Sequence, residues 1–85
     1  MPILSEFFGI EIRMWPTEHG VAHFHARYEG RNVSIGIRPL AVLRGSIRQR
    51  ALMLVLEWAL QHQQELESAW NDLRAGREPG QIEPL

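Results

Sequence analysis

The 85-residue sequence contains neither cysteine nor lysine. Without cysteine there can be no disulfide framework, no thiolate nucleophile and no cysteine-ligated zinc site. Stability must therefore come from a hydrophobic core or from oligomerisation. Without lysine, all basic side chains are arginines, whose planar guanidinium group suits two-pronged contacts with phosphate or carboxylate.

Long apolar runs are also missing. The longest one, Ala51 to Leu56, is far shorter than the ~18 residues that a membrane span requires. The N-terminus lacks the basic and then apolar pattern of a secretory signal. We therefore expect a cytoplasmic protein without a membrane span, and the length predicts a single domain over residues 1–85.

The formal net charge of −1 conceals an asymmetry between the two halves of the chain. Residues 1–50 carry seven arginines against four glutamates, which gives +3, whereas residues 51–85 carry two arginines against six acidic residues, which gives −4. This distribution excludes a uniformly basic nucleic-acid binder, but it allows a local anion site in the first half.

The first half alternates apolar and polar residues, which is typical of half-buried strands. The pattern predicts strands at about 8–15, 22–29 and 32–38, and it allows a fourth, short strand at 40–43. Gly30 and Arg31 fit a two-residue hairpin loop with glycine at the first central position. The resulting register would place Phe24 opposite Ile37, with apolar residues facing apolar partners.

The second half predicts one long helix over about 47–75. Ser46 and Gln49 have the spacing of a capping box, and Gly76 is the expected C-terminal stop. Whether the helix is continuous or breaks near residues 61–64 is left open by the pattern. Its N-terminal half is apolar on more than one side, which favours a homodimer formed through the helix.

The expected fold is therefore α+β, with a small antiparallel sheet of three to four strands packed on one long C-terminal helix. Residues 77–85, which contain two prolines and a glycine, are expected to form an extended tail.

Three of the four histidines lie close together at His19, His23 and His25. Because side chains alternate along a strand, His23 and His25 should share the face opposite to Phe24. Pairing with the first strand would bring Glu11 beside His25. The sheet face that results is polar, rich in arginine, and carries groups that titrate near neutral pH.

Three interpretations of this face remain open. In the first, it binds or cleaves RNA without a cofactor: His23 and His25 exchange a proton and Glu11 orients a ring. The arginines at 13, 27 and 38 would contact phosphate, and Trp15 would stack on a base.

In the second interpretation, His19, His23 and His25 bind a divalent transition metal, because a His-x-His pair on one strand face with a third histidine supplies three ligands. In the third, the chain is a non-enzymatic protein-interaction domain and the histidines are merely solvated. The fourth histidine, His62, lies beside the apolar stripe of the helix and is predicted to be partly buried and hydrogen-bonded.

Motifs along nearly the whole chain resemble a family of small bacterial and archaeal proteins catalogued as domain of unknown function 4160. They are Met1-Pro2-Ile3-Leu4, Phe8-Gly9-Ile10-x-Ile12-x-Met14, Glu18-His19-Gly20 leading into His23-Phe24-His25, Arg50-Ala51-Leu52 followed by Leu54-Val55-Leu56-Glu57-Trp58-Ala59, Glu65-Leu66 with Trp70, Gly76, and Ile82-Glu83-Pro84-Leu85. One departure is Ala22, where members of the family carry proline.

The resemblance implies no established activity. Members tend to be encoded beside another small protein, an arrangement that looks like a toxin and antitoxin pair. The resemblance thus favours an RNA-directed or partner-bound role, and the leading hypothesis is a toxin-antitoxin-type component whose histidine and arginine sheet face binds or cleaves RNA.

Overall fold

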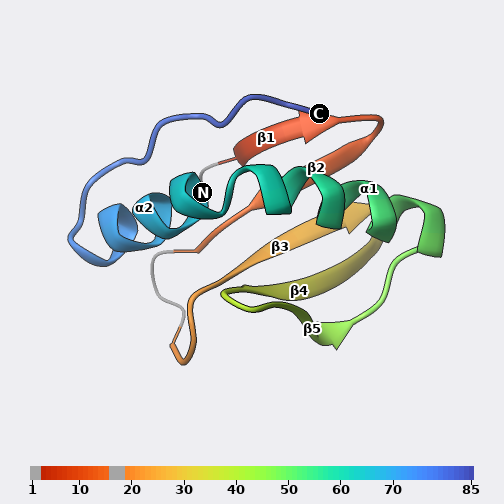
Figure 1. Cartoon of the computed structure of the whole chain (residues 1–85), viewed down its shortest axis with the longest axis horizontal. Helices are drawn as coiled ribbons and strands as arrows, with labels where there is room; N and C mark the ends of the chain where they lie inside the picture. The colour runs from red at the N-terminus through yellow and green to blue at the C-terminus, as the bar shows by residue number, and fades with distance from the viewer. Residues whose placement is uncertain (1–2, 16–18) are drawn as a thin grey trace.

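The computed structural model describes residues 3–15 and 19–85. These residues form one antiparallel sheet and two helices (Figure 1). In chain order the elements are β1 (Ile3–Phe7), β2 (Ile10–Arg13), β3 (His23–Tyr28), β4 (Arg31–Ile37), β5 (Leu40–Gly45), α1 (Gln49–Gln61) and α2 (Gln63–Arg74). The strands lie in the order of the chain, β1-β2-β3-β4-β5, so each pairs with its sequence neighbours. Both helices lie against one face of the sheet (Figure 1).

The core forms between that face and the helices. Ile12, Phe24 and Ile35 are fully buried, as the alternation within each strand predicts. The indole of Trp58 on α1 packs against the rings of Phe24 and Phe7, with centroids 6.1 and 5.4 Å apart. The opposite face of the sheet is left to the polar residues of the same strands.

The sheet has five strands, so the prediction of three to four strands was only roughly right. The strand missing from the prediction is β1. Its pairing with β2 shifts between Ile3 and Ser5, and Leu4 and Ser5 are both buried. This irregularity interrupts the alternation from which strands are predicted. The predicted strand at 8–15 also began too early, because Phe8 and Gly9 form the turn that joins β1 to β2.

In the hairpin between β3 and β4, the turn lies one residue earlier than predicted and the pairing register differs by two residues. Its turn is Glu29-Gly30, both with positive φ, and not Gly30-Arg31. Phe24 therefore pairs with Ile35. Because side chains alternate with a period of two, the shift keeps each residue on its predicted face and changes only its partner.

The predicted single helix is two helices. His62, with φ −128° and ψ 24°, separates α1 from α2. Beyond it, α2 continues in roughly the direction of α1 and does not fold back on it (Figure 1). The His62 ring is partly buried against Trp58, and its Nδ1 lies 2.5 Å from Glu65 Oε1, so the sequence-based interpretation of this histidine is confirmed. The predicted capping box does not form: α1 begins at Gln49, and Arg48 occupies the N-cap without a side-chain hydrogen bond.

The C-terminal end of α2 closes as predicted at Gly76. Gly76 has φ +78° and donates to the carbonyl of Leu73, while Arg77 N–H bonds to the carbonyl of Asp72. These two bonds satisfy the last carbonyls of the helix, and glycine accepts the left-handed conformation at no steric cost.

Residues 77–85 then run without helix or strand past β1 (Figure 1). Ile82 is buried, and its N–H donates to the carbonyl of Leu4 at 2.7 Å. The indole N–H of Trp58 donates to the carbonyl of Glu83, also at 2.7 Å. The tail thus covers the outer edge of β1. None of the helices in the described ranges is long and apolar enough to cross a membrane.

Candidate functional site

A row of four polar side chains crosses the sheet face that lies opposite the helices. The pairing register places Arg13 of β2 beside His25 of β3, His25 beside Ser34 of β4, and Ser34 beside Arg44 of β5. Directly paired residues point to the same face, so these side chains form one line across four strands. We call Arg13, His25, Ser34 and Arg44 the polar row.

The imidazole at the centre of the row is held from two sides. Ser34 Oγ lies 3.2 Å from His25 Nδ1, within hydrogen-bonding distance. The indole of Trp15 meets the same ring edge to face, with centroids 4.5 Å apart and planes at 79°. His25 and Trp15 are both half-buried, so part of each ring can reach a ligand on this face.

A second line of side chains runs parallel to the polar row. Glu11 pairs with Arg27, and Arg27 pairs with Asn32. Glu11 Oε1 accepts two hydrogen bonds from Arg13, at 3.0 and 3.1 Å, so this carboxylate is joined to a guanidinium and not to an imidazole. Glu11, Arg13 and Arg27 line a shallow hollow of about 390 Å³ together with two further glutamates, Glu6 and Glu29.

His23, the other histidine of the predicted pair, is buried at 8% exposure. Its ring lies between those of His25 and Trp70, with centroids 5.3 and 5.1 Å away. Its Nδ1 lies 2.7 Å from the carbonyl oxygen of Val21, so Nδ1 carries the proton and donates it to this bond. The two imidazoles are neighbours, as predicted, but His25 is the more accessible one.

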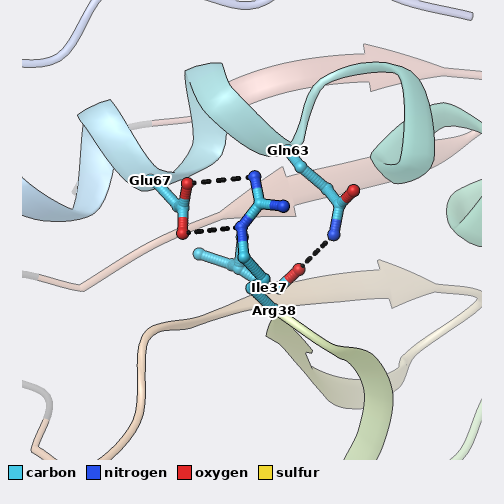
Figure 2. Close-up of polar contacts among 4 residues, drawn as sticks. All are labelled: Ile37, Arg38, Gln63 and Glu67. Carbon is cyan, nitrogen blue, oxygen red and sulfur yellow. Dashed lines mark hydrogen bonds and ion pairs between the residues drawn. The ribbon is translucent and has the colours of Figure 1, made fainter.

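Arg38, a predicted phosphate contact, lies in the turn between β4 and β5 and binds α2 instead. Figure 2 shows its guanidinium paired with Glu67, with Nε–Oε2 at 3.0 Å and Nη2–Oε1 at 3.2 Å. The side-chain hydrogen bonds, together with the opposite charge, lower the pKa of Glu67 and raise the pKa of Arg38. Next to this pair, the amide of Gln63 donates to the carbonyl of Ile37 at 2.8 Å (Figure 2). These contacts attach the second helix to the β4–β5 turn.

His19, the third histidine of the metal alternative, is exposed. Within residues 3–15 and 19–85, no three His, Asp or Glu side chains come together as ligands for a metal ion. Glu18, beside His19, lies outside the described residues, as do Met1 and Pro2 of the N-terminal motif.

One member of the polar row, Arg44, is absent from the sheet face predicted by sequence, and another, Ser34, is expected on that face but not opposite His25. The predicted hairpin placed Gly36 opposite His25, and the two-residue shift brings Ser34 there. Arg44 becomes part of the row because β5 extends to Gly45 and pairs with β4 throughout. A turn with glycine at its second central position was the signal that could have placed Ser34 opposite His25.

Residues 9–71 match the family described as a domain of unknown function (DUF4160). The match covers most of the 85-residue chain. The chain belongs to the DUF4160 family. The matched region of this DUF4160 chain includes the whole polar row, Trp15 and the Arg38–Glu67 pair, whereas β1 and the C-terminal tail lie outside it. No curated protein and no solved structure matches the chain.

Proposed function

We propose that this DUF4160 chain is a small toxin-antitoxin-type component that binds single-stranded RNA on the sheet face opposite its helices. The observation that carries the proposal is the polar row, in which two guanidinium groups flank an imidazole and a hydroxyl on neighbouring strands.

The chemistry of the row suits a phosphate backbone. Arginine binds phosphate through two parallel N–H donors, and serine can add a neutral donor. Arg27 and Arg44 are exposed, so their guanidinium groups can reach a ligand on this face. Arg13 is partly neutralised by Glu11, which predicts a smaller contribution from Arg13 than from Arg27 or Arg44.

The two rings beside the row suit the bases. A half-exposed indole offers a stacking surface to any unpaired base, and single strands expose bases that a duplex hides. Trp15 has this degree of exposure and is fixed against His25. This pairing of cations with an aromatic ring favours a single strand over a duplex.

His25 is the candidate acid or base if the bound RNA is also cleaved. An imidazole exchanges protons near neutral pH, and the contact with Ser34 restricts the orientation of this ring. Glu11 cannot be assigned the orienting role expected of it, because Arg13 occupies its carboxylate. Binding is therefore better supported than cleavage.

The binding test is fluorescence anisotropy with a labelled single-stranded RNA, compared with the duplex of the same sequence. Arg27→Gln and Arg44→Gln should each weaken binding and reduce the slope of log K against log salt by about 0.7 per lost phosphate contact. The matched control is Arg50→Gln, which removes an equally exposed arginine from α1. Equal losses in the control and in the two sheet variants would refute a site on the sheet face, as would the absence of RNA binding by the unmodified protein.

The toxin-antitoxin part of the proposal requires a separate test. Induced expression of the chain should slow bacterial growth, and co-expression of a small partner protein of the kind that the family resemblance implies should restore growth. Arg27→Gln combined with Arg44→Gln should remove the growth effect while the protein stays folded. Unchanged toxicity of this double variant would separate the growth effect from the sheet face.

A further inference from the structure

The two edges of the sheet differ in a way that the proposed RNA function does not use. At the β1 edge, the C-terminal tail bonds to the backbone through Ile82 and Leu4. At the other edge lies β5, which pairs with β4 and with no other strand among the described residues. Each of its residues is at least partly exposed.

An open strand edge presents unpaired N–H and C=O groups, and natural proteins usually protect it with lysine, proline or charge. Apart from an irregularity in pairing beside Leu43, the β5 strand has little of this protection. Arg44 is its single charged residue, and its centre is apolar, with Val42 45% and Leu43 49% exposed. The irregularity in the pairing between Ser34 and Ile35 leaves Leu43 without a partner on β4, so the regularly paired part of β5 is Leu40–Val42.

We infer that β5 is a dimerisation edge, at which two copies of the chain pair antiparallel about Val42. The occupant is a second copy because β5 is self-complementary in this arrangement. Val42 would lie opposite its own counterpart and Ala41 opposite Leu43, so apolar residues meet apolar residues. Arg44 lies on the face opposite to that of Leu40 and so falls outside this pairing, which avoids a contact between two like charges.

The faces of these residues agree with the pairing. Ala41 pairs with Gly36, and a Cβ placed on Gly36 would lie 3.7 Å from Leu43 Cδ1. Ala41 and Leu43 therefore lie on the same side of the sheet, as directly opposed residues must. Val42 pairs with the buried Ile35 and so lies on the side of the helices.

The covered β1 edge determines the size of the assembly. If both edges were open, copies could add one after another into a fibre. Because the tail covers β1, pairing through β5 uses the same surface on both copies and ends at two. So short a strand pair buries an area at the low end for stable complexes, which predicts a dimer whose population depends on the protein concentration.

This interface differs from the one expected from the sequence, which used the helix. Met53 and Leu60 on α1 remain 62% and 66% exposed, but the backbone of a helix has no unpaired hydrogen-bonding groups along its side. The two surfaces can be distinguished with matched lysine variants. Val42→Lys places a charge on the strand edge, and Met53→Lys places the same charge on the helix.

The first experiment is sedimentation velocity of the RNA-free protein at concentrations from about 1 µM to 1 mM. The unmodified chain and Met53→Lys should dimerise alike, whereas Val42→Lys should stay monomeric with an unchanged circular dichroism spectrum. If the unmodified chain is monomeric at the highest concentration, the inference is overturned. So would a Met53→Lys monomer beside a Val42→Lys dimer, which would assign the interface to the helix.

The second experiment uses the absence of cysteine and does not depend on the folding of a lysine variant. In the proposed pairing, the two Val42 Cα atoms lie about 4.5–5.5 Å apart, within the range that a disulfide spans. Val42→Cys treated with diamide should therefore form a covalent dimer rapidly, and Met53→Cys should not. Equal cross-linking of both variants, or none at Val42→Cys, would exclude the β5 pairing. Both experiments are done without RNA, so their failure would leave the proposed function standing.

Discussion

Arg38 and Glu67 join the β4–β5 turn to α2 through two parallel hydrogen bonds, 3.0 and 3.2 Å long (Figure 2). Arg38 comes directly after the strand that carries Ser34, and Glu67 lies one turn of helix before Trp70, which packs on His23. The pair therefore connects the helix layer to the end of the sheet at which the histidine strand begins.

This contact predicts a small loss of stability in acid. The hydrogen bonds from Arg38 hold the pKa of Glu67 below its ordinary value. A carboxylate whose pKa is lowered by folding contributes stability that is fully present above the unfolded pKa of about 4.3 and is lost as pH falls through the folded pKa. Between roughly pH 5 and pH 3, the melting temperature should therefore fall more in the unmodified protein than in Glu67→Gln.

The control for this prediction is Glu57→Gln, which changes an exposed glutamate on α1. This variant should keep the acid sensitivity of the unmodified chain. Because the Arg38–Glu67 pair is exposed, water and salt screen it, and the difference should shrink further at 1 M salt. A Glu67→Gln protein with the same pH dependence as the unmodified chain would contradict the linkage.

The indole of Trp58 is expected to hold the C-terminal tail against the helix layer. Its N–H donates to the carbonyl of Glu83 at 2.7 Å. Trp58→Phe removes this donor and part of a buried ring, so the free energy of unfolding should fall by about 1–3 kcal/mol. Amide exchange at Ile82 should accelerate more than exchange in β3. The matched control is Glu83→Ala, which keeps the carbonyl and should leave both measurements unchanged; loosening of the tail in this control would shift the role to the side chain.

Removing the buried hydroxyl of Ser5 should not destabilise the protein. Ser5 is 6% exposed, and its Oγ has no hydrogen-bond partner within residues 3–15 and 19–85. Because a buried hydroxyl without a partner costs free energy, Ser5→Ala should leave the unfolding free energy unchanged or raise it by up to ~1 kcal/mol. Ser34→Ala, which removes a hydroxyl that contacts His25, should lower it slightly. A drop above ~1 kcal/mol in Ser5→Ala on chemical denaturation would mean that this hydroxyl is satisfied in solution.

Periodicity predicted the strands β2 to β4 and the faces of their residues because these strands alternate regularly. It missed β1, in which Leu4 and Ser5 are buried consecutively at a shift in pairing. It predicted one helix and left open a break near residues 61–64, because the apolar stripe continues past His62 although the backbone there leaves the helical conformation. Local dihedral angles of this kind depend on tertiary packing, which no pattern of residue types contains.

Which residues are neighbours in the site depends on the pairing register of the strands more than on residue type. Placing the hairpin turn one residue too late shifted the pairing register by two residues, which left His23, His25 and Arg27 on the predicted side of the strand but gave each a wrong neighbour. Arg38 was expected on that face, whereas the turn carries it to Glu67 on α2. That partner lies 29 residues away in sequence, and no short-range signal announces it.

The two histidines of β3 predict opposite results on substitution. His23 is buried, contacts Trp70 and donates to the carbonyl of Val21, so His23→Ala should lower the unfolding free energy by about 1–3 kcal/mol. His25 is half-buried and belongs to the polar row, so His25→Ala should cost less than ~1 kcal/mol while weakening RNA binding. His19→Ala, at an exposed position, is the control for both and should change neither stability nor binding. Denaturant unfolding measures stability and fluorescence anisotropy measures RNA binding on the same preparations. If His25→Ala is as unstable as His23→Ala, then His25 belongs to the packing and not to the site.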